Sequence, residues 1–159
     1  MASAVQTSAR LQAEAFTRAA EEATNGADAV AAVAMYAADA RFQAISNGLI
    51  EVHRGQEEIL RAWQVYMHFG RELGLQIRKQ MIATSDEVIV IEWQGRLRNG
   101  TRVAGNELCW LRDGLMYEHH LYSNIGIRPA SSLSGRLRTL RSDPRFALRL
   151  LAAQRSLAR

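Results

Sequence analysis

Residues 101–124, TRVAGNELCWLRDGLMYEHHLYSN, predict two antiparallel strands joined at Asp113-Gly114. An Asp-Gly pair between two runs of alternating residues is a strong β-hairpin signal. Because side chains alternate across a strand, each strand of this hairpin presents every second residue to the same side. An amide, a carboxylate, an imidazole and a phenol then share one face: Asn106, Glu118, His120 and Tyr122.

The register of the hairpin decides which of these groups meet. If the loop spans residues 111–115, Leu108 lies opposite Glu118 and Asn106 lies opposite His120, within reach of a hydrogen bond. A slip of one residue would destroy that pairing. His119 points to the opposite face, where we expect it at an interface or in solvent.

The chain before residue 75 has helical spacing, and the chain after it has the spacing of strands. Capping residues and apolar periodicity predict helices over 8–24, 28–36 and 56–69, with a short strand over 40–45. Four further strands are predicted over 75–82, 87–98, 101–110 and 115–124. Helices followed by a meander indicate an α+β fold, a cone-shaped curved antiparallel sheet packed against three N-terminal helices, over residues 1–130.

Composition restricts the class of protein. A chain of 159 residues with 48% apolar residues has room for one domain with a real core. Its single cysteine, Cys109, precludes an intramolecular disulfide, so we expect a cytoplasmic protein. No export signal is visible, and no stretch approaches the roughly 20 apolar residues of a transmembrane span.

Residues 131–159 form an arginine-rich extension. They hold seven arginines and one aspartate, which leaves the rest of the chain slightly acidic. Four arginines gather on one side of a basic helix predicted from Pro144: Arg145, Arg149, Arg155 and Arg159. Such a helix could lie on an anionic membrane or an acidic partner, or pack in solvent on its own dimer. We expect no nucleic-acid binding, because there the basic surface is usually part of the fold.

Three segments and their order resemble the nuclear transport factor 2-like superfamily, most of all SnoaL-like polyketide cyclases and relatives of ketosteroid isomerase. They are YAADARF at 36–42, HRGQEEILRAW at 53–63 and WLRDGLMYEHHLYSN at 110–124. The likeness covers about residues 8–126 and implies a cone with a pocket. Function transfers less well, because this superfamily places unrelated chemistries and pure binding roles in the same cone.

The catalytic residues of those relatives do not carry over. The base carboxylate of ketosteroid isomerases aligns with Ala44, the oxyanion-hole aspartate with Asn106, and the tyrosine of the first helix with Phe16. The late aspartate of many SnoaL-like cyclases falls at or near Asn124, and an amide cannot take up a proton at neutral pH.

The polar face of the hairpin supplies other candidates. His120 is the first choice for a general acid or base, with Glu118 beside it to raise its pKa. Tyr122 and Asn106 could donate hydrogen bonds to a developing oxyanion. Each has a structural alternative: a satisfied buried histidine, a salt-bridged glutamate, a core aromatic and a strand amide.

Aromatic and aliphatic residues predict a pocket for a flat hydrophobic ligand. Its expected lining is Phe16, Tyr36, Trp63, Ile91, Trp93, Leu108 and Trp110, with Asn124 nearby. Asp39 could contribute or merely tie down the turn from helix to strand, and His53 could reach the ligand from a loop or merely be exposed. Val88 and Val90 would lie on the outer face, whose cover would be a second subunit, so we expect a homodimer.

Two functions remain open. The first is a small cofactor-independent cyclase, isomerase or dehydratase that acts by acid–base chemistry on a hydrophobic, carbonyl-bearing, polyketide-like molecule. The second is a non-catalytic ligand-binding or assembly module of the same fold. We expect no cofactor, and no metal because His119 and His120 diverge and no zinc-ligand spacing surrounds Cys109.

Overall fold

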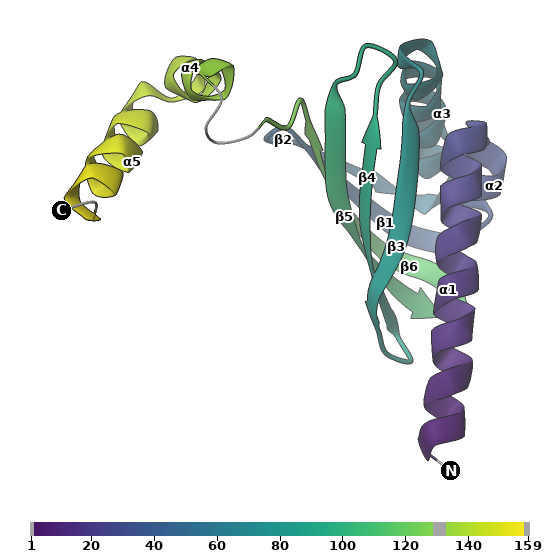
Figure 1. The fold of residues 1–159 in the computed structure, drawn as a ribbon. Helices are drawn as coiled ribbons and strands as arrows, with labels where there is room; N and C mark the ends of the chain where they lie inside the picture. Colours follow the sequence, from purple (N-terminus) through teal and green to yellow (C-terminus); the bar gives the residue numbers. More distant parts are fainter. Residues whose placement is uncertain (1, 129–132, 158–159) are drawn as a thin grey trace. The chain divides into compact units, whose positions relative to one another are not determined.

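The computed structural model describes residues 2–128 and 133–157, and the chain divides into two compact units, Met1–Gly126 and Ile127–Arg159. The first unit contains three helices and a six-stranded sheet (Figure 1). The predicted α+β class, a curved sheet with N-terminal helices, is confirmed, although β1 and β2 come before the third helix. None of the helices in the described ranges combines the length and the hydropathy needed to cross a bilayer.

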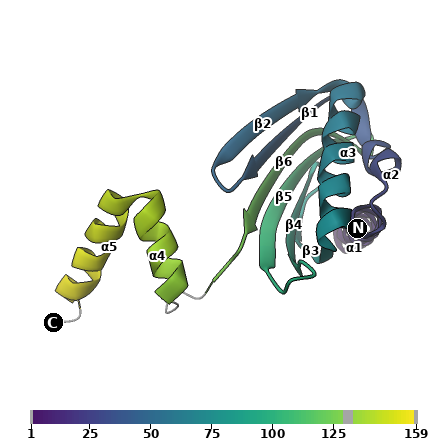
Figure 2. The same cartoon turned by 90° about the horizontal axis from the view of Figure 1, so that it is seen from above.

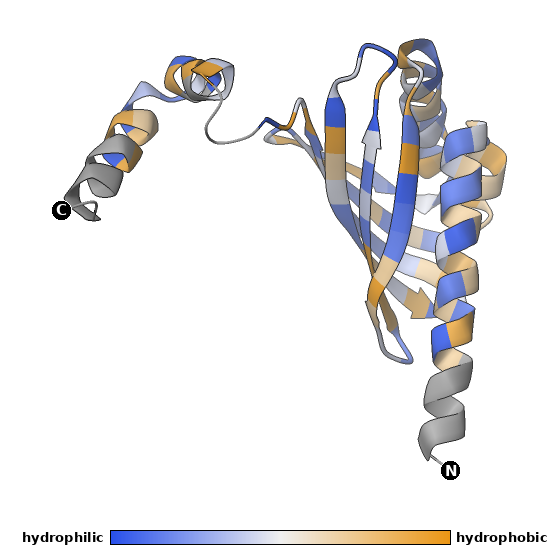
Figure 3. Cartoon of the chain, in the orientation of Figure 1, coloured by the Kyte–Doolittle hydropathy of each residue, from blue (hydrophilic) through white to orange (hydrophobic). Residues whose placement is uncertain are grey.

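The helices form where capping and periodicity predict them. Helix α1 spans Ala2–Gly26, α2 spans Ala29–Val33 and α3 spans Gly55–Leu73. Asp28 caps α2 by accepting a hydrogen bond of 2.9 Å from the Ala31 N–H. Gly74 ends α3 in the left-handed conformation, at φ 63°. Hydrophobic and hydrophilic residues mix along α1 (Figure 3), as expected of a helix with one packed face.

The sheet has the strand order β2-β1-β6-β5-β4-β3. Strands β1 and β6 pair in parallel, contrary to the antiparallel sheet predicted, and the other neighbours pair antiparallel. The strand bounds are Tyr36–Ser46 for β1, Leu49–Arg54 for β2, Gln76–Thr84 for β3, Val88–Arg96 for β4, Arg102–Arg112 for β5 and Leu115–Ile125 for β6.

In the first unit, strand β2 is an element that the sequence did not predict. Asn47 and Gly48 both have positive φ, 50° and 88°, as in the tight turns that join two hairpin strands. The chain therefore continues from β1 into β2 through a turn of two residues, Asn47 and Gly48. Leu49 and Ile50 are exposed on this edge strand. The strand therefore lacks the alternation of apolar and polar residues by which a half-buried strand is predicted from sequence.

The helices cover one face of the sheet (Figure 2). Helix α1 packs on β3, and α3 packs on β1 and β2. The core lies between these layers, where the rings of Phe42 and Trp63 stack with centroids 5.5 Å apart. Ile59 and Ile91 are fully buried beside them. A sheet with one face against helices leaves its other face without cover from this unit.

The second unit contains two helices where the sequence predicts one. Helix α4 spans Leu133–Ser142 and α5 spans Pro144–Leu157. Asp143 lies between them and accepts a hydrogen bond of 2.9 Å from the Phe146 N–H, which caps α5. Arg159 lies outside the described residues, and the side chain of Arg155 is not described.

Candidate functional site

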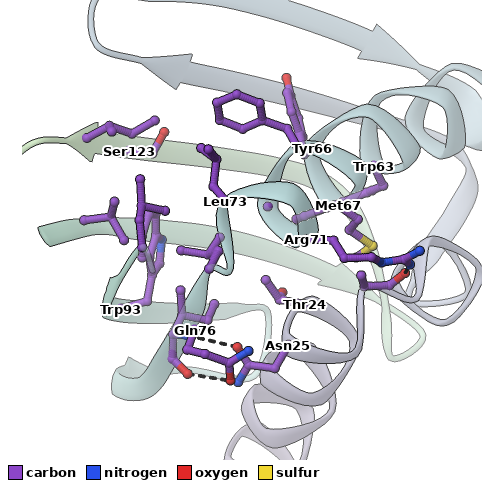
Figure 4. Close-up of a pocket in the computed structure, with 18 of the residues that line it drawn as sticks. Thr24, Asn25, Trp63, Tyr66, Met67, Arg71, Leu73, Gln76, Trp93 and Ser123 are labelled. Atoms are coloured by element: carbon purple, nitrogen blue, oxygen red, sulfur yellow. Dashed lines mark hydrogen bonds between the residues drawn. The ribbon is translucent and has the colours of Figure 1, made fainter. Parts of the chain in front are cut away.

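A cavity of about 440 Å³ lies between α3, the end of α1 and the face of the sheet that the helices cover. Figure 4 shows Trp63, Tyr66 and Met67 along α3, with Trp93 on the sheet. The rest of the lining is mostly apolar and includes Leu75, Ile77, Val103, Leu121 and Ile125.

Most polar groups of the cavity are already bonded within the protein. The Asn25 side chain exchanges two hydrogen bonds of 2.9 Å with the backbone of Ile77. The hydroxyls of Ser46 and Ser123 bond each other at 2.5 Å. The indole Nε1 of Trp93, in contrast, is buried and has no hydrogen-bond partner. Trp93 lines the cavity, so the cavity wall contains a buried N–H donor without a partner.

An ion pair also lines the cavity. Lys79 Nζ donates to Glu107 Oε1 at 2.6 Å, and the two side chains are 2% and 5% exposed. Burial by itself raises the pKa of Glu107, but the Lys79 ammonium and the neighbouring His119 outweigh burial and lower this pKa to about 2. Glu107 is therefore a carboxylate at neutral pH.

A buried chain of polar contacts leads from this pair to α3. His119 Nε2 lies 3.6 Å from Glu107 Oε2, and His119 Nδ1 shares a hydrogen bond of 2.5 Å with the Tyr36 hydroxyl. Trp63 Nε1 donates to the same hydroxyl at 3.1 Å. Burial lowers the pKa of His119 and raises the pKa of Tyr36, so both side chains are neutral at neutral pH.

The predicted hairpin register is wrong by two residues. Asn106 pairs with Tyr122, Leu108 with His120, and Trp110 with Glu118. The loop is a tight turn with Asp113 and Gly114 at φ 54° and 77°, and a bulge follows Trp110, so pairing shifts along the strands. A shift of two preserves which residues share a face.

That shared face, however, is turned away from the helices. Within it His120 Nε2 lies 2.6 Å from Glu118 Oε1, Arg41 pairs with the same carboxylate, and Trp110 lies edge-on to the His120 ring at 4.9 Å. None of the four predicted catalytic residues lines the cavity. Leu108 and Trp110 share this outer face and do not join the cavity lining, contrary to the prediction.

The other predicted ligand-binding residues divide between the cavity, the core and the surface. Trp63 and Trp93 line the cavity, and Ile91 is plain core. Phe16 and Tyr36 line a smaller neighbouring cavity of about 20 Å³. At the surface, Asp39 pairs with Arg112 at 2.5 Å and Asn124 is exposed on the outer face.

Two histidine predictions are wrong. His53 lies on β2, where its ring packs against Phe42 with centroids 5.8 Å apart, and is not in a loop. His119 is 1% exposed, not solvent-facing. The sequence missed Lys79, Glu107 and His119 as cavity-side groups because hydropathy favours Leu108 and Trp110 as the inward residues of β5. The ion pair between Lys79 and Glu107 allows Glu107 to be buried instead, and this places Leu108 and Trp110 on the outer face.

Comparison with known proteins identifies the fold. No family model matches the sequence, and no curated protein matches it. An NTF2-like protein of unknown function from Mesorhizobium loti is 17% identical, with a TM-score of 0.59 over 70% of this chain and 90% of that one. Another from Burkholderia xenovorans is 14% identical, with a TM-score of 0.60 over 80% and 94%. The fold is nuclear transport factor 2-like.

The NTF2-like fold by itself assigns no activity. A candidate ketosteroid isomerase from Kribbella flavida is 20% identical, with a TM-score of 0.59 over 76% of this chain and 84% of that one. A de novo designed protein with a curved β-sheet is 11% identical, with a TM-score of 0.56 over 71% and 85%. The same fold thus extends to a designed protein, so function has to be argued from the cavity.

Proposed function

We propose that this protein binds one small hydrophobic molecule in the cavity and that Trp93 Nε1 donates a hydrogen bond to an acceptor on it, such as a carbonyl oxygen. The observation that carries this proposal is an apolar cavity of about 440 Å³ with one unpaired buried donor. Ligand pockets are typically about 300–1,000 Å³, mostly apolar, with few polar groups that fix orientation.

Energetics favour a ligand with an acceptor at that position. A buried N–H without a partner costs about 1–3 kcal/mol, and a ligand oxygen would remove that cost. The rings of Trp63 and Trp93 and the side chains of Met67 and Leu121 would contact the apolar body of the ligand. A flat ring ketone satisfies both requirements.

The test compares a ketone with its hydrocarbon counterpart. Tag-free protein is titrated with 2-acetonaphthone and with 2-isopropenylnaphthalene, which replaces the carbonyl oxygen by a methylene group, and tryptophan fluorescence follows binding. We expect the wild type to prefer the ketone by several-fold, because only the ketone accepts from Trp93. Trp93→Phe keeps a ring but removes the donor, so it should lose the preference.

The control is Trp110→Phe on the outer face of the sheet, which should retain the wild-type preference. Equal ketone preference in Trp93→Phe and the wild type would contradict the proposed orientation. Failure of both compounds to bind the wild type at their solubility limits would contradict an open hydrophobic cavity.

A second candidate is acid–base catalysis on the bound carbonyl compound, as in an isomerase, cyclase or dehydratase acting on a polyketide-like substrate. Lys79 and Glu107 line the cavity, and an ammonium ion can stabilise a developing enolate. The fold's likeness to a candidate ketosteroid isomerase agrees with this activity. The pKa of Glu107, about 2, makes it a weak base, so binding is the better supported function.

Proton exchange distinguishes catalysis from binding. A catalytic cavity would exchange the methyl protons of 2-acetonaphthone for deuterium in D₂O faster than buffer does, as measured by NMR. Lys79→Met would lose this exchange, whereas His120→Gln on the outer face would retain it. Exchange no faster than in buffer would contradict catalysis on this ketone while leaving the binding proposal intact.

We also propose a homodimer formed through the outer face of the sheet, with the cytoplasm as its location. This face carries a polar cluster of Arg41, Glu118 and His120. It also carries four half-buried apolar side chains, those of Val88, Val90, Leu108 and Trp110. Among the described residues of the first unit, no helix packs on this face. Analytical ultracentrifugation should show a dimer that Val90→Arg dissociates, and a monomeric wild type would contradict it.

A further inference from the structure

Three side chains of metal-binding type converge on β5 and β6. Glu107 and Cys109 lie two residues apart on β5, and His119 is the cross-strand partner of Cys109 on β6. One donor atom from each lies within 4.8 Å of the other two. All three side chains are buried. The sequence did not predict this cluster, because the pairing of Cys109 with His119 depends on the register of the hairpin.

His119 Nε2 has no hydrogen-bond partner, although it is buried. Glu107 Oε2 lies 3.6 Å away, which is too far for a hydrogen bond. A tetrahedral zinc ion with metal–ligand distances of about 2.1 Å holds a nitrogen and an oxygen ligand about 3.4 Å apart. The separation of these two atoms is therefore close to that of a metal site.

We propose that Glu107, Cys109 and His119 bind one divalent cation of the zinc type. Zinc accepts thiolate, imidazole and carboxylate together, whereas calcium and magnesium prefer oxygen ligands. Cys109 is a free thiol and would release its proton to solvent as the metal–sulfur bond forms. The proposal is independent of the small-molecule ligand of the large cavity.

Groups behind the three ligands hold them in place. The Tyr36 hydroxyl bonds His119 Nδ1 at 2.5 Å, which leaves Nε2 for the metal. Lys79 Nζ bonds Glu107 Oε1 at 2.6 Å, which leaves Oε2. Such partners orient metal ligands in known sites. The positive charge of Lys79 also repels the metal ion, so the affinity of this site for zinc should lie below that of a closed all-cysteine site.

A fourth coordination position is available beside the cluster. Glu107 and His119 both line the small cavity of about 20 Å³. A space of this size holds about one water molecule. Three protein ligands and one open position are typical of catalytic zinc sites, whereas structural sites are closed by four protein ligands.

Cobalt(II) provides the test, because its absorption reports the ligands. Metal-free, tag-free wild-type protein is titrated with cobalt chloride in the absence of any small molecule. We expect a near-ultraviolet thiolate-to-cobalt band and the visible bands of tetrahedral cobalt, saturating at one equivalent and displaced by zinc. Because Cys109 is the single cysteine of the chain, such a band can come from no other residue.

Variants assign the remaining ligands. Cys109→Ser should lose the thiolate band, and His119→Gln should weaken cobalt binding by at least about tenfold. His68→Gln on α3, whose side chain is 74% exposed, is the matched control and should bind as the wild type does. His119→Gln that binds as tightly as the wild type would overturn the ligand set.

The wild-type titration decides the question even if a ligand variant does not fold. Absence of a thiolate band up to millimolar cobalt, in protein that circular dichroism shows to be folded, would overturn the proposal. Such a result would leave the ketone-binding proposal untouched, since neither experiment uses the other's ligand.

Discussion

At the scale of single residues, His119 and Glu107 are two groups whose protonation should destabilise this protein at acidic pH. Burial lowers the pKa of His119 below its usual 6.5, so below that pH the unfolded chain binds a proton that the folded chain does not. The pKa of Glu107 is lowered from 4.5 to about 2, so its contribution to stability is lost as pH falls through that range.

We therefore expect the free energy of unfolding to fall as pH is lowered from about 6.5. One proton contributes at most about 1.4 kcal/mol per pH unit. Urea unfolding between pH 7.5 and 5 should show a shallower slope for His119→Gln than for the wild type, and an unchanged slope for His68→Gln, whose side chain is 74% exposed. Identical slopes for His119→Gln and the wild type would contradict a buried neutral imidazole.

Tyr36 is the second residue whose role is testable alone. Its hydroxyl bonds both His119 Nδ1 and Trp63 Nε1 inside the core. Tyr36→Phe leaves those nitrogens without their partner, so we expect a loss of about 1–3 kcal/mol in the free energy of unfolding. Denaturant titration measures the loss, with Tyr117→Phe at the surface as the control. A loss no larger than that of the control would argue against the buried chain.

At the scale of elements, Gly105 on β5 sets the position of Trp93. A Cβ on Gly105 would lie 2.0 Å from the Tyr122 carbonyl oxygen and 2.5 Å from the Trp93 ring. Gly105→Ala should therefore destabilise the protein by about 1–3 kcal/mol and weaken ketone binding, because Trp93 has to move. At Gly26 a Cβ meets nothing within 4 Å, so Gly26→Ala is the control for the stability measurement. Equal ketone affinity in Gly105→Ala and the wild type would contradict this link.

The elements also show what the sequence can and cannot predict. Periodicity and capping predicted three helices and most strands, because these signals are local. The parity of the hairpin was right, so Glu118 and His120 do share a face and do contact each other. The sequence did not predict which face of the sheet meets the helices. Hydropathy places Glu107 at the surface, but its ion pair with Lys79 compensates its charge and allows it to be buried under the helices.

At the scale of the whole molecule, the cavity belongs to the first unit alone. Its lining residues all lie between Thr24 and Ile125. A chain that ends at Arg128 should therefore fold, with a Tm within about 2 °C of the full chain, and should bind 2-acetonaphthone with unchanged affinity. Calorimetry and the fluorescence titration measure both. A tenfold loss of affinity would show that the arginine-rich extension takes part in ligand binding.

The central claim is that the space between α3 and the sheet holds a ligand whose oxygen meets Trp93. The most direct measurement is a crystal structure of the protein grown with 2-acetonaphthone. We predict the naphthalene ring against Trp63 and Met67, with the carbonyl oxygen about 3 Å from Trp93 Nε1. A cavity closed by side chains, or a ligand found on the outer face beside Trp110 and His120, would contradict the account.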